Sequence, residues 1–375
     1  MKKIQMVDLV SQYQHIKADV DAAIINVLDT ASYINGPEVQ QFKKELAEYL
    51  GVKHVIPCAN GTDALQIAMM ALNLQPGDEV IAPSWTYVAT VEVVALLKLK
   101  INFVDSDPDT FNIDVKKIEA AITPRTKAIV PVHLYGQSSD MDPILELARK
   151  HNLYVIEDNA QAIGASYTSR EGWTRKTGTI GTVGTTSFYP SKNLGCYGDG
   201  GAILTNDDKL ADKLATIANH GQHRRYYHDE VGVNSRLDSV QAAVLRRKLP
   251  HLDSYNQRRN EAAAAYDKWF ANNPNLKVPF RAPNSTHVFH QYTLTLLNGD
   301  RDKLSEHLNA KGVPHSVFYP VPNHLQAAFS NMGYKEGDFP TVEDLAKRVI
   351  SLPMHSELEP DQIAYIAQSV LEFFQ

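Results

Sequence analysis

One lysine lies between a short apolar run and a glycine-rich stretch in the segment 185–206, TTSFYPSKNLGCYGDGGAILTN. Phe188 and Tyr189 suit a β-strand, and Pro190 ends it just before Lys192. Glycines follow where the backbone can approach a ligand closely, at positions 195, 198, 200 and 201. A lysine on such a turn can form a Schiff base with a carbonyl cofactor. Most lysines are solvated surface charges, so the rest of the chain must decide between these two roles.

An aspartate, Asp158, follows an apolar strand in the motif VIEDNAQAIGA. In an open parallel sheet, ligands bind at the carboxyl ends of the strands, so we expect this carboxylate to face a site. A buried carboxylate must pair with a cation, and a protonated ring nitrogen is one candidate. A helix cap or a structural ion pair is the alternative interpretation.

Small and hydroxyl-bearing residues near other strand ends suit an anion. Asn60-Gly61-Thr62 lies at a strand-to-helix turn, where free N–H groups and the positive helix end favour a phosphate. The alternative is that Thr62 simply caps the helix. Ser187 could add a hydroxyl to a phosphate or be a small packed residue. Trp85 could stack on a flat ring or belong to the core.

A basic segment precedes the motif NSRLD. Arg236 in this motif could bind a carboxylate or a phosphate through its forked guanidinium, while Asn234 could cap the following helix. The run HGQHRRYYH at 220–228 could bind a diphosphate or form a solvated loop.

Apolar periodicity indicates which elements carry these residues. It predicts helices over 11–30 and 37–50, and strands near 54–57, 101–104, 128–132 and 153–158. Strands that alternate with helices favour βαβ units and a largely parallel sheet, so the fold class is α/β. After about residue 202 the pattern changes, and a charge-rich helix over 251–269 leads into new strands. We expect a large domain over 1–255, with the N-terminal helices, and a small domain over 256–375.

The composition argues against several classes of protein. A formal charge of −6 over 375 residues gives no basic excess, which argues against nucleic acid as a partner. Cys58 and Cys196 form neither a disulfide framework nor a metal-binding CxxC, and they suit a reducing cytoplasm. The start lacks the apolar run of a signal peptide, and Val88–Leu97 is too short to span a bilayer. We expect a cytoplasmic protein without a metal site or membrane contact.

Five motifs occur in a recognisable order: NGTDAL, PSWTYVAT, VIEDNAQAIGA, SFYPSKNLGCYGDGGAI and NSRLD. With them the chain resembles, over essentially its whole length, the nucleotide-sugar aminotransferases of the DegT/StrS type. These are fold type I enzymes that use pyridoxal 5′-phosphate. The resemblance implies a large domain with a mostly parallel mixed sheet and a smaller α+β C-terminal domain. It also implies a homodimer with active sites at the interface.

The resemblance also implies roles for individual residues. Lys192 would form the Schiff base and carry protons, and Asp158 would pair with the pyridinium nitrogen. The remaining cofactor contacts would be Gly61, Thr62 and Ser187 at the phosphate, Trp85 and Gln161 at the ring, and Asn234 from the other subunit.

Lysine at position 192, where related sugar dehydratases carry histidine, favours amino transfer over removal of a hydroxyl. The amino donor, expected to be glutamate, would leave the cofactor as pyridoxamine 5′-phosphate, which would convert a keto-sugar to an amino-sugar for surface glycan or amino-sugar biosynthesis. Two alternatives stay open: a non-enzymatic regulatory or assembly protein on the same fold, and an aminotransferase for a simple 2-oxo acid.

Two segments of the sequence narrow the class of sugar that the chain is expected to bind. RRYYHDEVGVNSRLD resembles enzymes for a UDP-linked 3-keto sugar acid, with Arg236 at the carboxylate. Those enzymes carry a histidine where this chain has Phe318, before Tyr319. His324, in PNHLQ, resembles enzymes that make 3-amino deoxysugars on dTDP. These residues are therefore candidate substrate contacts, with C3 preferred over C4 and the nucleotide left open.

Overall fold

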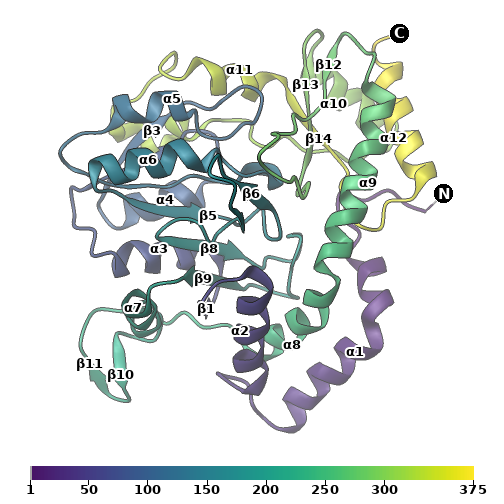
Figure 1. The fold of residues 1–375 in the computed structure, drawn as a ribbon. Coiled ribbons are helices and arrows are strands. Elements are labelled where there is room, and N and C mark those ends of the chain that lie inside the picture. The colour runs from purple at the N-terminus through teal and green to yellow at the C-terminus, as the bar shows by residue number, and fades with distance from the viewer. Residues whose placement is uncertain (1) are drawn as a thin grey trace.

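The computed structural model describes residues 2–375, and a seven-stranded sheet forms the centre of the larger lobe (Figure 1). Its strand order is β1-β9-β8-β5-β4-β2-β3. The strands are β1 (His54–Cys58), β2 (Glu79–Pro83), β3 (Lys100–Val104), β4 (Thr126–Ile129), β5 (Tyr154–Asp158), β8 (Val183–Ser187) and β9 (Gly201–Thr205). β9 runs antiparallel to both of its neighbours, and all the other pairs are parallel. The predicted mostly parallel mixed sheet is confirmed.

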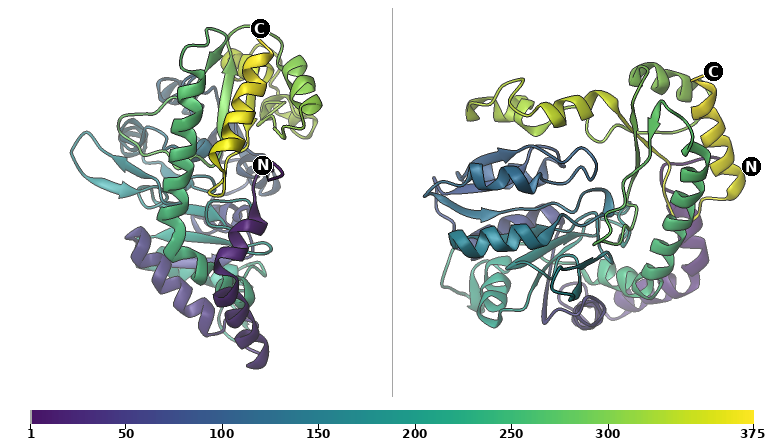
Figure 2. Two further views of the ribbon diagram at one scale, coloured as in Figure 1. Left: turned by 90° about the vertical axis from the view of Figure 1, so that its right-hand side faces the viewer. Right: turned by 45° about the horizontal axis from the view of Figure 1, so that its top comes forward.

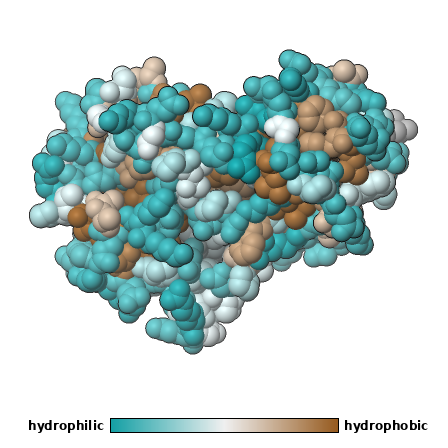
Figure 3. Space-filling model, turned by 90° about the horizontal axis from the view of Figure 1, so that it is seen from above, coloured by the Kyte–Doolittle hydropathy of each residue, from teal (hydrophilic) through white to brown (hydrophobic). Residues whose placement is uncertain are grey.

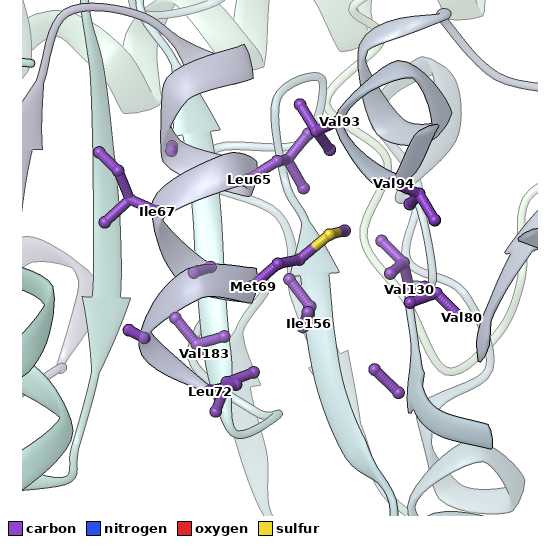
Figure 4. Packing of buried hydrophobic residues seen from close by; sticks show 14 of the residues in the cluster. Leu65, Ile67, Met69, Leu72, Val80, Val93, Val94, Val130, Ile156 and Val183 are labelled. Atoms are coloured by element: carbon purple, nitrogen blue, oxygen red, sulfur yellow. The ribbon is translucent and has the colours of Figure 1, made fainter. Parts of the chain in front are cut away.

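Helices cover both faces of this sheet, because successive strand residues point to opposite sides. Val80 on β2 belongs to an apolar cluster that includes residues of α3 (Gly61–Ala71), α4 (Ala89–Leu96) and α7 (Asp208–Ala218). Ile81, which points to the other face, belongs to a cluster with residues of α6 (Met141–His151). Figure 4 shows Leu65 and Met69 of α3 among these apolar side chains. Most strand residues are therefore apolar on both faces, as expected for a sheet buried on both sides.

Three helices extend this lobe below the sheet. α1 (Leu9–Asp29) and α2 (Pro37–Leu50) both contact α8 (Ser239–Lys248). The predicted helices over 11–30 and 37–50 correspond to α1 and α2. α2 ends at Gly51 in the left-handed conformation, with φ 66°, as its sequence pattern predicts.

The C-terminal part has its own core. Strands β12 (Leu276–Lys277), β13 (Tyr292–Leu296) and β14 (Val349–Leu352) form an antiparallel sheet, covered by α9 (Leu252–Phe270), α10 (Arg301–Ala310) and α12 (Pro360–Glu372). A further helix, α11 (Pro340–Arg348), precedes β14.

The long helix α9 runs between the two cores (Figure 2). Leu252 packs with the core of α2, while Ala262 to Phe270 pack with the small sheet. The predicted division after residue 255 falls inside this helix and stays a prediction. The surface seen from above is mostly hydrophilic, with apolar patches on both lobes (Figure 3).

Helix α3 does not begin as in the alternative interpretation, in which Thr62 is its cap. The Asn60 side chain accepts a hydrogen bond from the Asp63 N–H at 2.8 Å, so Asn60 is the N-cap and Thr62 lies inside the first turn. This correction leaves the Thr62 hydroxyl free of a capping role.

We predict that Asn60→Ala lowers the free energy of unfolding of the cofactor-free protein by about 1 kcal/mol, because the Asp63 N–H loses its acceptor. Asn60→Asp is the matched control, since a carboxylate can accept the same bond and is favoured at a helix start. The urea midpoint measures both. Equal stability of the alanine and aspartate variants would contradict the assignment of the cap.

Candidate active site

Asp158 lies at the carboxyl end of β5, where the sheet topology also brings the end of β8. It is 5 % exposed. Its Oδ2 accepts a hydrogen bond from the Thr90 hydroxyl at 2.7 Å, and its Oδ1 accepts one from the Ala160 N–H at 3.1 Å. Within residues 2–375 no side chain forms an ion pair with it at bonding distance. The carboxylate is thus held by neutral donors and is suited to a cationic ligand.

Lys192 lies in the loop after β8, near enough to feel the charge of Asp158. Burial lowers the pKa of its amine to about 8, although the charge of Asp158 acts in the opposite direction. In the described chain no hydrogen-bond partner is found for its Nζ. A lysine with these properties is a nucleophile that is half neutral near pH 8.

The loop that carries Lys192 is held from several sides. Phe188 packs edge-on against Phe42 at 5.4 Å, and the Cys196 N–H donates to the Phe188 carbonyl at 2.8 Å. A Cβ on Gly195 would lie 2.3 Å from the Pro190 carbonyl oxygen, so only glycine fits there.

Two helices hold the same loop through side chains. The Asn193 amide donates to Asn256 Oδ1 at 2.7 Å and to the Val288 carbonyl at 2.9 Å. The buried Lys248 of α8 donates to the Gly195 carbonyl at 2.7 Å. Asn193 directly follows Lys192, so these bonds fix the backbone next to the reactive amine.

The start of α3 forms a cradle beside Ser187. A Cβ on Gly61 would lie 2.8 Å from the Ser187 Cβ, so the helix start approaches the strand end as closely as glycine allows. Ser187 Oγ accepts a hydrogen bond from the Tyr189 N–H at 3.3 Å. The N–H groups of this eleven-residue helix, with the hydroxyls of Thr62 and Ser187, are suited to a phosphate.

The structure does not give Trp85 an open ring face. It is 1 % exposed, and its Nε1–H donates to Tyr135 Oη at 3.1 Å. Tyr87, two residues further on, is 57 % exposed, and its ring centroid lies 6.3 Å from that of Tyr319. Tyr87 is therefore more accessible to a flat ligand than Trp85, in contrast to the role predicted for Trp85.

Gln161 connects the two lobes at the site. Its Oε1 accepts a hydrogen bond from the Tyr135 N–H at 2.8 Å, and its Nε2 donates to Tyr319 Oη at 3.0 Å. Tyr319 is also within range of the charge of Asp158. Phe318 is half-buried, and its carbonyl accepts a hydrogen bond from the Tyr135 hydroxyl. Gln161, Phe318 and Tyr319 are thus brought to one wall next to Asp158.

His324 is buried rather than open to a substrate, in contrast to its predicted role. It is 2 % exposed, its Nδ1 lies 2.7 Å from Ser84 Oγ, and its Nε2 lies 3.0 Å from Glu343 Oε1. Both ring nitrogens are occupied, so this side chain holds protein segments together.

Asn234 and Arg236 flank a buried serine beneath the cradle. Ser235 Oγ accepts a hydrogen bond from the Ala59 N–H at 3.0 Å, next to the start of α3. Asn234 is exposed, and Arg236 is half-buried without an ion pair in residues 2–375. The guanidinium of Arg236 is therefore available to an anionic ligand.

Two site residues had not been predicted. Thr90 supplies the 2.7 Å bond to Asp158, and the only sequence signal is a hydroxyl in the helix after a strand end. His290 is 6 % exposed and its pKa lies well below its usual value, mainly through burial and also through the charge of Lys192. The bond of Thr90 to Asp158 and the effect of Lys192 on His290 both involve residues far apart in the sequence, which periodicity does not detect.

The described residues contain no group of three or more His, Cys, Asp and Glu side chains that could hold a metal ion. In the same part of the chain, no helix combines the length and hydrophobicity needed to cross a bilayer.

A profile for the DegT/DnrJ/EryC1/StrS aminotransferase family matches residues 14–371. A relative from Pseudomonas aeruginosa, named UDP-2-acetamido-2-deoxy-3-oxo-D-glucuronate aminotransferase, is 48 % identical over 98 % of this chain and 99 % of its own. A relative from Geobacillus stearothermophilus, named pleiotropic regulatory protein, is 44 % identical over 99 % of each chain.

Solved structures show the same fold. DesV from S. venezuelae, in complex with a ketimine intermediate, superposes with a TM-score of 0.95 and 42 % identity, covering 100 % of this chain and 99 % of its own. NtdA from Bacillus subtilis, with bound cofactor PMP, superposes with a TM-score of 0.91 and 31 % identity, covering 99 % of this chain and 85 % of its own. The predicted fold class, that of the fold type I enzymes, is confirmed.

We predict that acetic anhydride labels Lys192 of the cofactor-free protein at a rate that rises with pH, is half-maximal near pH 8 and levels off about one pH unit higher. Below about pH 8 the amine is protonated and unreactive, and above it the neutral form dominates. Peptide mass spectrometry gives the rate for each lysine. An ordinary lysine, with a pKa of about 10.5, gains reactivity up to that value and serves as the internal comparison. A Lys192 rate that still rises tenfold between pH 9 and pH 10 would contradict the lowered pKa.

Proposed function

The chain belongs to the DegT/DnrJ/EryC1/StrS aminotransferase family, and we propose that it transfers an amino group to C3 of a nucleotide-linked keto-hexose with pyridoxal 5′-phosphate as cofactor. One observation carries the proposal: the amine of Lys192, for which residues 2–375 supply no hydrogen-bond partner, lies within range of the charge of the buried Asp158 carboxylate at the carboxyl end of β5. The cradle at Gly61 and Ser187 completes the set.

The residues present fit this cofactor. The close approach of Gly61 to Ser187 leaves helix N–H groups and hydroxyls for a phosphate dianion. Asp158, which has only neutral donors, suits a protonated ring nitrogen. Tyr87 and Gln161 would lie at the ring, since Trp85 is enclosed. When bound, the cofactor withdraws electrons from the carbon that bears the amino group.

Lys192 moves the proton in this proposal. A pKa of about 8 lets its Nζ accept a proton from the carbon that bears the amino group at a pH close to neutrality, and with the cofactor bound Nζ would deliver that proton to the cofactor's C4′. Asp158 keeps the ring nitrogen protonated, and the bonds of Asn193 and Lys248 hold the loop so that Nζ returns to the same place.

The substrate class follows from charge and from the relatives. Glutamate would give its amino group and leave as 2-oxoglutarate, and the keto-sugar would leave as the amino-sugar. Arg224 and Arg225 lie over the rings of Tyr227 and Tyr226, and with Arg236 they provide cations for a nucleoside diphosphate. A further relative, from Streptomyces venezuelae, is named dTDP-3-amino-3,4,6-trideoxy-alpha-D-glucose transaminase and is 42 % identical over 99 % of this chain and 96 % of its own. Its name and that of the Pseudomonas relative, a 3-oxo sugar acid aminotransferase, support C3.

A homodimer is part of the proposal. Exposed apolar residues lie on and just after α1 and on the hairpin β10–β11 (Gln222–Arg224 and Tyr227–His228), a pattern suited to burial against a second copy. They are Val10, Ile25, Leu28, Tyr33, Ile34, Tyr226 and Tyr227. In such a dimer the exposed Asn234 would reach the phosphate of the partner.

A regulatory role is the second candidate, because the Geobacillus relative is named as a regulatory protein. The intact chemistry of Lys192, Asp158 and the cradle favours the enzyme. If the acceptor were a simple 2-oxo acid, Arg224 and Arg225 of the hairpin would have no ligand to bind, so these residues favour a larger anionic substrate.

We predict that the protein, loaded with pyridoxal 5′-phosphate and given glutamate, converts UDP- or dTDP-linked 3-keto-sugars to amino-sugars, as read by mass spectrometry. Lys192→Ala should lower turnover by roughly 10²–10⁴-fold, because the proton carrier is lost. Lys311→Ala, on an exposed ion pair with Glu372, is the control and should leave turnover unchanged. Activity on free 2-oxo acids alone would contradict the sugar substrate, and full turnover by Lys192→Ala would contradict the mechanism.

We predict that Arg236→Ala raises KM for the keto-sugar about tenfold or more, because a charge-assisted hydrogen bond to an anionic group is lost. The half-reaction with glutamate should keep its rate. Arg236→Lys should recover only part of the loss, since a lysine cannot bind two oxygens with one fork. An unchanged KM in the alanine variant would exclude Arg236 from sugar binding.

A further inference from the structure

Two buried threonine hydroxyls lie in a row behind Asp158. Thr90, in the first turn of α4, is 0 % exposed and donates from Oγ1 to Asp158 Oδ2 at 2.7 Å. Thr86 is 4 % exposed, and its Oγ1 lies 3.2 Å from Thr90 Oγ1. Neither side chain belongs to the set that would touch the cofactor or the sugar.

The chemistry of Asp158 fixes the direction of these bonds. An ionised carboxylate only accepts hydrogen bonds, so the proton of Thr90 must point at Asp158. Because Thr90 has a single hydroxyl proton, it can only accept from Thr86. Both O–H dipoles then point toward the carboxylate, and each bond strengthens the next.

The far end of this row is held by the C-terminal part of the chain. The Asn323 side chain donates to the Thr86 carbonyl at 2.9 Å, and its backbone N–H donates to the Ser84 carbonyl at 2.9 Å. Ser84 Oγ lies 2.7 Å from His324 Nδ1. These bonds fix the backbone over 84–86 and therefore the position of the Thr86 hydroxyl. The buried His324 contributes to this through its bond with Ser84.

We propose that Thr86 and Thr90 form a directed hydrogen-bond chain that holds the Asp158 carboxylate aimed at the ring nitrogen of the cofactor. This inference rests on the proposed function, since that nitrogen belongs to the cofactor. Without Thr90, Asp158 keeps one protein donor, the Ala160 N–H at 3.1 Å, for a charge that is 95 % removed from solvent. Thr90 is a positioning residue that acts on the ring nitrogen through Asp158.

The test compares Thr90→Val with Thr90→Ser, each loaded with pyridoxal 5′-phosphate that carries ¹⁵N at the ring nitrogen. Valine keeps the shape of threonine without the hydroxyl, whereas serine keeps the hydroxyl. We expect the unchanged protein and Thr90→Ser to show the ¹⁵N shift of a protonated ring at neutral pH. Thr90→Val should move toward the unprotonated shift and bind the cofactor about tenfold more weakly.

Thr205→Val is the matched control, because Thr205 is 3 % exposed and its hydroxyl donates to the Thr182 carbonyl at 3.1 Å. It should change stability but neither the ¹⁵N shift nor the affinity. Thr86→Val should give a smaller change in the same direction as Thr90→Val, and it decides the question if Thr90→Val does not fold.

The proposal would be overturned if Thr90→Val kept both the ¹⁵N shift of a protonated ring and an unchanged affinity for pyridoxal 5′-phosphate. If only Thr86→Val folds, the same result in that variant would overturn it. If the unchanged protein itself binds no pyridoxal 5′-phosphate, the proposed function fails instead, so the two failures are distinguishable.

Discussion

The rest of the site depends on a buried negative charge. Asp158 is 5 % exposed, and the only hydrogen bonds to its carboxylate within residues 2–375 come from Thr90 and Ala160. Two neutral donors only partly offset the cost of removing a carboxylate from water. A cationic ring nitrogen would supply the missing charge, so the folded protein should be stabilised by its cofactor. Near this carboxylate the amine of Lys192 keeps a pKa of about 8, since burial outweighs the attraction of Asp158.

The sheet topology assembles this site from distant segments. β5 and β8 are parallel neighbours, with Asp158 opposite Thr185, so their carboxyl ends open on the same edge. The start of α3 reaches that edge because Gly61 has no side chain to clash with Ser187. The start of α3, the carboxylate of Asp158 and Lys192 therefore meet because of the strand order and of one close backbone approach. This agrees with ligand binding at strand ends in α/β proteins.

The sequence predicted the features that depend on local patterns. Strand ends and apolar runs placed Asp158 at the end of β5 and the cradle at the start of α3, and the family resemblance supplied the roles of these residues. The strand before Lys192 was predicted to include Phe188 and Tyr189, but β8 ends at Ser187. Side-chain direction was not predictable in the same way. Trp85 and His324 have residue types suited to ligands, yet both turn into the core, where Tyr135 and Ser84 take their polar atoms. These partners lie 50 and 240 residues away, so only the tertiary structure reveals them.

The central claim is that Lys192 is the amine that bonds covalently to the cofactor beside Asp158. Borohydride reduction of the protein mixed with pyridoxal 5′-phosphate, followed by peptide mass spectrometry, tests it most directly. The account predicts one reduced cofactor per chain, on the peptide that contains Lys192, and none there in Lys192→Ala. Label spread over surface lysines, with Lys192 unmodified, would contradict it.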